Sequence, residues 1–254
     1  MTKPVLEVRD LRKVFPAGDG DDFVAVEGAS FAVMPGECVG LVGGSGSGKS
    51  TIAHMVTRLV DPTSGTIVLA GRDVTNVRGA EQRRMAKDVQ MVFQNPVSSF
   101  DPRRTLGYGI AESLRNFGSP KSEARDRAVD LLRRCGLSSE FADRYPREVS
   151  GGQCQRAAIA RALVPNPPLV ICDEATSALD VTVQAQIVDL LRDIARERGT
   201  SYLFICHDLA LVQGFCNRVL VMQTGRIVEQ GPVEEVTTNP QHPYTRELLD
   251  SSLK

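Results

Sequence analysis

Residues 39–56 read Val39-Gly40-Leu41-Val42-Gly43-Gly44-Ser45-Gly46-Ser47-Gly48-Lys49-Ser50-Thr51-Ile52-Ala53-His54-Met55-Val56. The apolar run at 39–42 predicts a buried strand, and the run that begins at 52 predicts a helix. Between them lies the pattern G-x-x-x-x-G-K-S, a loop whose backbone N–H groups can surround a phosphate at a helix N-terminus. A glycine-rich turn with an unrelated lysine has no reason to fall between a strand and a helix. The stretch therefore predicts a nucleotide site.

The residue types of this loop suit particular contacts with a nucleotide. Glycine tolerates the backbone conformations that turn successive N–H groups inward. Lys49 is expected to reach the β- and γ-phosphates, and the Ser50 hydroxyl is expected to ligate Mg²⁺, which prefers oxygen ligands. The loop residues assigned to ATP are Gly43, Gly44, Ser45, Gly46, Ser47, Gly48, Lys49, Ser50 and Thr51.

Composition is that of an ordinary globular protein. Of 254 residues, 42% are hydrophobic and 24% are charged, which is enough apolar material for a sizeable core. The 30 Lys and Arg residues nearly balance 31 Asp and Glu residues, so no overall positive field favours nucleic acid as a partner. The six cysteines form no C-x-x-C pair that would indicate a metal site, and they are expected to be reduced, buried thiols in a cytosolic protein.

Apolar runs and helical patterns alternate along most of the chain. The predicted strands lie near 5–8, 24–33, 38–42, 66–70, 89–93, 169–172, 202–206, 219–222 and 226–230, and the predicted helices near 49–58, 120–135, 151–163 and 182–197. Such alternation favours an α/β fold with a mainly parallel sheet covered on both faces. Residues 95–165 show helical spacing and no convincing strand, so we expect them to form a helical subdomain inserted in the core.

A second helix N-terminus follows at Ser150-Gly151-Gly152-Gln153. Ser150 and Gln153 have the spacing of a capping box, and the alanine-rich helix that follows is expected to run until Pro165. An uncovered helix N-terminus attracts anions. Because the phosphate loop already serves the nucleotide of this chain, the second helix end is expected to complete the site of a neighbouring subunit.

Two carboxylates follow the apolar run at 169–172. Asp173 and Glu174 are expected at the carboxyl end of a buried strand, the edge where open α/β sheets bind ligands. Asp173 is expected to hold Mg²⁺ through its waters. Glu174 is expected to polarise the water that attacks the γ-phosphate.

Together the three segments resemble the ABC-type ATPases, and the resemblance extends from residue 6 to residue 249. It implies a P-loop NTPase (RecA-like) core, an antiparallel β subdomain and an inserted α-helical subdomain, with ATP and Mg²⁺ as cofactors. In that family the Ser-Gly-Gly-Gln signature contacts ATP across a head-to-tail dimer of cassettes, which assigns Ser150, Gly151, Gly152 and Gln153 to the nucleotide of a partner.

Other positions follow from the same resemblance. Gln94 matches the Q-loop glutamine that reaches Mg²⁺ or water, and His207 matches the histidine that senses the γ-phosphate. Asp180 ends the segment Ser177-Ala178-Leu179-Asp180, which matches the loop that crosses the dimer interface. Phe15 is the candidate for stacking on adenine, with Phe23 as the competing choice.

The C-terminal segment resembles the tails of one subfamily of these ATPases. Residues 239–245 contain His242-Pro243-Tyr244, and this tail resembles that of ATPases serving oligopeptide, dipeptide and nickel importers. The segment from Gln94 to Arg103 resembles the extended Q-loop of the same group. We therefore expect an ABC ATPase domain over 1–230 and a short tail of this type over 231–254.

The resemblance also implies partners and a location. We expect a second cassette (a copy or a paralogue), two transmembrane permease subunits, and indirectly an extracytoplasmic substrate-binding protein. No apolar stretch approaches the roughly 20 residues that span a bilayer, so we expect the chain at the cytoplasmic side of the membrane through its permeases. The alternatives are the ATP-binding component of a soluble phosphonate carbon–phosphorus lyase complex and a soluble ABC ATPase acting on nucleic acid or the ribosome, which ordinarily carries two cassettes or long inserted arms.

Overall fold

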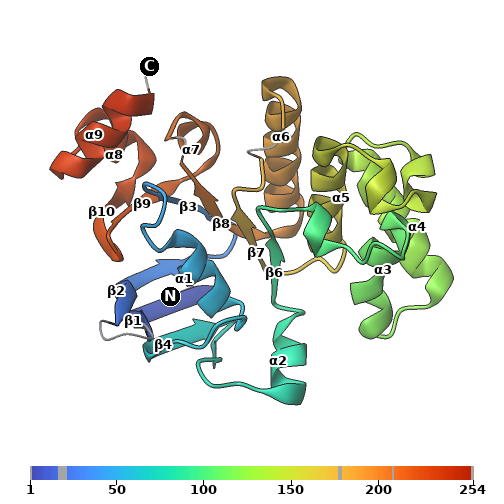
Figure 1. Ribbon diagram of the computed structural model, residues 1–254, viewed down its shortest axis with the longest axis horizontal. Coiled ribbons are helices and arrows are strands. Elements are labelled where there is room, and N and C mark those ends of the chain that lie inside the picture. The colour runs from blue at the N-terminus through green and yellow to red at the C-terminus, as the bar shows by residue number, and fades with distance from the viewer. Residues whose placement is uncertain (1, 17–21, 177–178, 208, 253–254) are drawn as a thin grey trace.

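The protein consists of two β-sheets and a separate group of helices. The computed structural model describes residues 2–16, 22–176, 179–207 and 209–252. Figure 1 shows β1, β2 and β4 beside α1, the strands β3 and β6–β9 at the centre, and α3, α4 and α5 gathered at the opposite side of the molecule. The C-terminal helices α8 and α9 lie beyond β10, on the same side of the central strands as β1 and β2.

The strands are β1 (Leu6–Phe15), β2 (Phe23–Val33), β3 (Cys38–Val42), β4 (Ser64–Leu69), β5 (Arg72–Asp73), β6 (Val89–Val92), β7 (Leu169–Asp173), β8 (Ser201–Cys206), β9 (Arg218–Gln223) and β10 (Arg226–Pro232). The α-helices are α1 (Lys49–Val56), α2 (Gly79–Met85), α3 (Leu106–Asn116), α4 (Lys121–Arg134), α5 (Gly151–Leu163), α6 (Val181–Arg198), α7 (Leu209–Phe215), α8 (Val233–Thr238) and α9 (Pro243–Ser252). Short 3-10 turns are η1 (Val97–Ser99), η2 (Ser139–Asp143) and η3 (Pro146–Glu148).

Strand order explains where a site can form. The larger sheet runs β10-β9-β3-β8-β7-β6, and every neighbouring pair from β9 to β6 is parallel, while β10 is antiparallel to β9. The smaller sheet, β2-β1-β4-β5, is antiparallel. Because the carboxyl ends of parallel strands meet at one edge, the segments that follow β3, β6, β7 and β8 converge there. The α/β fold class with one mainly parallel and one antiparallel sheet is confirmed.

The central strands are buried on both faces, which is why they read as continuous apolar runs. Along β8, Leu203 and Ile205 face the core shared with the antiparallel sheet and α1. Tyr202 and Phe204 face the other core, which includes buried residues of α3, α4, α5 and α6. This period-two division follows from the alternation of side chains along a strand.

The structure contains elements that the sequence did not predict. These are β5, α2, α3, α7, α8 and α9. Helix α3 contains Gly107 and Gly109, which lower helix propensity by about 1 kcal/mol each relative to alanine. A Cβ at Gly107 would lie 2.7 Å from the carbonyl oxygen of Ala142, so a glycine allows α3 to pack closely against η2. The close packing outweighs the weak local preference.

None of the helices in the described part of the chain is both long enough and apolar enough to cross a membrane.

Candidate nucleotide site

The phosphate loop connects β3 to α1, as its sequence predicts. The backbone angle φ is 154° at Gly43 and 104° at Gly48, and residues other than glycine rarely adopt these values. A Cβ at Gly43 would lie 2.1 Å from the carbonyl oxygen of Met222, and one at Gly48 would lie 2.3 Å from that of Ala25. Glycine at these two positions lets the loop pass between β9 and β2.

Lys49 is buried and turned back onto the loop. Its Nζ donates to the carbonyl oxygens of Gly43 at 2.7 Å and Gly44 at 2.8 Å, and to the hydroxyl of Ser47 at 3.3 Å. Burial lowers the pKa of Lys49, although the carboxylates of Glu174 and Asp173 act in the opposite direction. A desolvated ammonium on a glycine-rich loop that leads into a helix suits the binding of a phosphate.

Ser50 and Asp173, the two side chains expected to hold Mg²⁺, lie beside each other. The Ser50 hydroxyl donates to Oδ1 of Asp173 at 3.1 Å, and Asp173 is buried at the end of β7. Burial raises the pKa of Asp173, partly offset by this hydrogen bond. Hydroxyl and carboxylate oxygens fit Mg²⁺, whose other ligands are ordinarily waters and phosphate oxygens. Among the described residues, no group of three or more His, Cys, Asp and Glu side chains is placed to hold a metal ion.

Three side chains from three strand ends meet beyond Asp173. The amide Nε2 of Gln94, after β6, donates to Oε2 of Glu174 at 2.6 Å. Nδ1 of His207, after β8, lies 3.9 Å from Oε1 of Glu174. The backbone N–H of Glu174 donates to the carbonyl of Ile205 at 3.0 Å, and its φ is 47°. A carboxylate in an unusual backbone conformation, approached by an amide and an imidazole, has the chemistry that the predicted proton acceptor needs, and that role stays a prediction.

The predicted capping box begins α5. The Ser150 hydroxyl accepts from the N–H of Gln153 at 3.2 Å, and Oε1 of Gln153 accepts from the N–H of Ser150 at 2.9 Å. Gly151 is exposed, and a Cβ added there would meet nothing within 4 Å. Figure 1 shows α5 apart from α1, with β6 and β7 between them. The two phosphate-binding candidates of one chain therefore do not face the same spot.

The structure describes the predicted interface residue Asp180 and both candidates for adenine stacking. Asp180 caps α6, since its Oδ1 accepts from the N–H of Val183 at 3.0 Å. Ser177 and Ala178, the start of the predicted interface loop, lie outside the described residues. Phe15 and Phe23 are direct partners across β1 and β2, and both are exposed, at 37% and 59%. The ammonium of Lys13 lies 4.7 Å from the centre of the Phe15 ring. The two candidates for adenine stacking are therefore neighbours.

One contact to the phosphate loop has no signal in the local sequence. The hydroxyl of Tyr244, on α9, accepts from the N–H of Gly44 at 2.7 Å, although the two residues are 200 positions apart. The sequence assigned His242-Pro243-Tyr244 only to a subfamily, and a contact over this separation follows from the fold alone.

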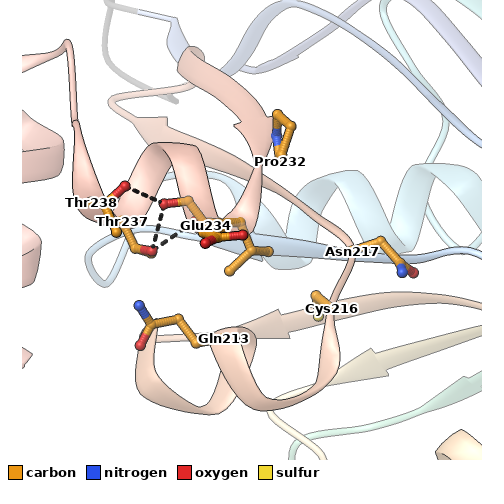
Figure 2. Close-up of a pocket in the computed structure, with 8 residues that line it drawn as sticks. Gln213, Cys216, Asn217, Pro232, Glu234, Thr237 and Thr238 are labelled. Atoms are coloured by element: carbon orange, nitrogen blue, oxygen red, sulfur yellow. Dashed lines mark hydrogen bonds between the residues drawn. The ribbon is translucent and has the colours of Figure 1, made fainter.

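A separate pocket of about 490 Å³ lies near the other end of the central strands. Figure 2 shows Gln213, Cys216, Asn217 and Glu234 among the residues that line it. Oδ1 of Asn217 accepts from the N–H of Cys38, the first residue of β3, at 2.9 Å, whereas the phosphate loop follows the last. The pocket is therefore not part of the nucleotide site.

Known proteins match this chain in sequence and in structure. The family model described as ABC transporter matches residues 26–177. Glutathione import ATP-binding protein GsiA of Salmonella paratyphi A is 48% identical, over 97% of this chain and 41% of that protein. GsiA of Escherichia coli (strain K12) gives the same identity and coverage. The chain thus spans about 41% of the length of these curated relatives.

Two solved cassettes have the same fold. A dimeric post-hydrolysis state of the ATP-binding cassette MJ0796, bound to ADP and Pi, has a TM-score of 0.85 and 28% identity, covering 90% of this chain and 98% of that one. CbiO1 from Clostridium perfringens, part of the ABC transporter complex cbiONQ, has a TM-score of 0.79 and 28% identity, covering 93% of this chain and 91% of that one.

Proposed function

The chain belongs to the ABC transporter family, as an ATPase cassette, and we propose that it energises an importer of small peptides. The observation that supports import most directly is the 48% identity, over 97% of this chain, to relatives named for glutathione import. Glutathione is itself a small peptide, and the His242-Pro243-Tyr244 tail favours the oligopeptide, dipeptide and nickel group. These two observations together favour a peptide cargo over nickel.

ATP hydrolysis follows from the residues at the strand ends. We propose that Lys49 and the N–H groups of residues 45–51 bind the phosphates and that Glu174 accepts the proton of the attacking water. Gln94 and His207 would orient that water and the γ-phosphate, because both side chains lie against Glu174. Mg²⁺, held by Ser50, Asp173 and Gln94, would neutralise phosphate charge when bound.

A second cassette would complete the site. One chain supplies the phosphate loop, and the α5 N-terminus at Ser150, Gly151, Gly152 and Gln153 stands apart from it, so we propose that each nucleotide lies between the loop of one subunit and α5 of the other. Asp180, at the N-terminus of α6, would lie at the same interface. ATP binds the closed dimer preferentially and therefore shifts the equilibrium toward closure, and hydrolysis reverses it.

The surface between the core and the α3–α5 helices suits the membrane subunits. A groove of about 660 Å³ lies between α2 and α3, beside Gln90 of the strand that leads to Gln94. It is lined by the cations Arg83, Arg84 and Lys87 and by Phe117. We propose that one permease docks in this groove of each cassette, so that two permeases serve the dimer. Each would contribute a segment with acidic and apolar side chains, which would hold the chain at the cytoplasmic face of the membrane. An extracytoplasmic substrate-binding protein would then act through the permeases.

Affinity capture tests the proposal against the lyase alternative. The Glu174→Gln variant would be captured from detergent-solubilised cells with ATP present, with the Lys49→Ala variant as the matched control. We expect two multispanning membrane proteins to accompany Glu174→Gln and to be depleted with Lys49→Ala. Soluble metabolic proteins in place of membrane proteins would instead support the carbon–phosphorus lyase reading.

Replacement of the two phenylalanines separates the candidates for adenine stacking. Base–aromatic stacking contributes about 1–3 kcal/mol per base, so replacing the stacking residue by alanine is expected to raise the KM for ATP roughly 5- to 150-fold. We expect Phe15→Ala to have this effect and Phe23→Ala to have a small one. The KM for ATP of the two variants checks this, and a larger effect of Phe23→Ala would reverse the assignment.

A further inference from the structure

The C-terminal tail reaches the nucleotide site through one side chain. Tyr244 is the second residue of α9, and its hydroxyl accepts the N–H of Gly44 at 2.7 Å. The ring is half-buried against the core that also includes Val42, the last residue of β3. The contact thus joins the end of the chain to the first turn of the phosphate loop.

Glu229 of β10 holds the tail in this position. Its carboxylate accepts from the N–H of Gln241 at 2.7 Å, from the N–H of His242 at 3.0 Å, and from the hydroxyl of the fully buried Thr245. Burial acts to raise the pKa of Glu229, but these hydrogen bonds together hold that pKa below its usual range. Nδ1 of His242 then accepts from the N–H of Tyr244 at 3.2 Å. The turn before α9 is therefore built around one carboxylate.

Tyr244 and Lys49 act on the same peptide unit. The carbonyl of Gly43 accepts from Lys49 at 2.7 Å, and the N–H of Gly44, in the same peptide plane, donates to Tyr244. A phosphate that draws the Lys49 ammonium away removes the first of these bonds. The second bond remains, because it comes from outside the loop.

We propose that Tyr244 is a positioning residue of the nucleotide site, which fixes the Gly43–Gly44 peptide so that the phosphate loop is preorganised for ATP. This inference rests on the proposed function, because it takes ATP as the ligand of the phosphate loop. It also gives a reason for a glycine at position 44. A Cβ at Gly44 would lie 3.1 Å from the tyrosine oxygen, closer than most Cβ contacts, so a glycine there makes room for the hydroxyl.

The substitution that tests this role removes only the Tyr244 hydroxyl. Tyr244→Phe keeps the buried ring, and Ser251→Ala, which removes a hydroxyl hydrogen bond to Leu248 from the same helix, is the matched control. A neutral hydrogen bond contributes about 1 kcal/mol, so we expect Tyr244→Phe to raise both the Kd and the KM for ATP about fivefold with kcat nearly unchanged. Ser251→Ala is expected to match the parental chain.

Amide hydrogen exchange provides a second readout that tail packing alone would not change. In the full chain without nucleotide, we expect the Gly44 N–H to exchange about fivefold faster in Tyr244→Phe than in the parental chain, with no change in Ser251→Ala. If both the ATP affinity and the Gly44 exchange rate were unchanged in Tyr244→Phe, the inference would be overturned, while the proposed function would stand. A parental chain that bound no ATP would overturn the proposed function and the inference together.

Discussion

Glu174→Gln is expected to lower kcat for ATP hydrolysis about 100- to 10,000-fold, the range for loss of a general base, while ATP still binds. The amide is nearly the same size as the carboxylate, and Glu174 accepts a hydrogen bond from Gln94 that the amide oxygen can also accept. The variant lacks only a group that takes the proton from water. Because ATP then persists, we expect a stable ATP-bound dimer, which size-exclusion chromatography with light scattering measures.

The matched control is Glu197→Gln, which neutralises a surface carboxylate paired with Arg134 on α4. We expect this variant to hydrolyse ATP at the parental rate and to dissociate as the parental chain does. If Glu174→Gln also hydrolysed ATP at the parental rate, Glu174 would not be the catalytic base.

Lys49→Ala is expected to weaken ATP binding about 100-fold or more. A hydrogen bond from a charged donor contributes about 1.5–3 kcal/mol, and the ammonium is expected to contact two phosphate groups. Folding is expected to change little, because the buried ammonium already bears a desolvation cost that lowers its pKa. Equilibrium titration with a fluorescent ATP analogue measures the affinity.

Lys121→Ala serves as the comparison, since Lys121 is an exposed lysine at the start of α4. It is expected to bind ATP as the parental chain does. Equal affinity of Lys49→Ala and the parental chain would remove Lys49 from the phosphate site.

The features that short segments determine could be predicted from the sequence. The phosphate loop is a continuous pattern between a strand and a helix, and it was predicted from that pattern. The Ser150 capping box is a four-residue pattern, and it was predicted with its two hydrogen bonds. Gln94 and His207 were assigned from the family resemblance, and the structure places both beside Glu174, because parallel strands bring their carboxyl ends to one edge. The confirmed predictions are the family, the fold class and the ATPase cassette.

The sequence did not reveal features that depend on packing between distant segments. Residues 95–165 were expected to be helical, but the bounds of α3 were not predicted because its glycines weaken the local signal. The close approach of Gly107 to Ala142, which favours glycine there, depends on tertiary packing. Helix α9 begins at Pro243, which reads locally as part of a turn. The Tyr244–Gly44 hydrogen bond joins segments 200 residues apart and leaves no local pattern. The roles of individual site residues stay predictions.

Two chains are expected to share each nucleotide, and mixing two variants tests this sharing most directly. Gly151→Asp places a carboxylate where the partner's phosphate is expected, and it fits because a Cβ at Gly151 meets nothing within 4 Å and acidic residues suit a helix N-terminus. Lys49→Ala disables the loop of the other chain. Both chains also carry Glu174→Gln, and association with ATP is followed by light scattering.

Each variant alone is expected to stay monomeric with ATP, since both sites of its dimer are defective. The mixture is expected to form a heterodimer with one intact site, built from the loop of the Gly151→Asp chain and the α5 N-terminus of the Lys49→Ala chain. A mixture that stayed monomeric, under conditions where Glu174→Gln alone dimerises, would contradict the shared site.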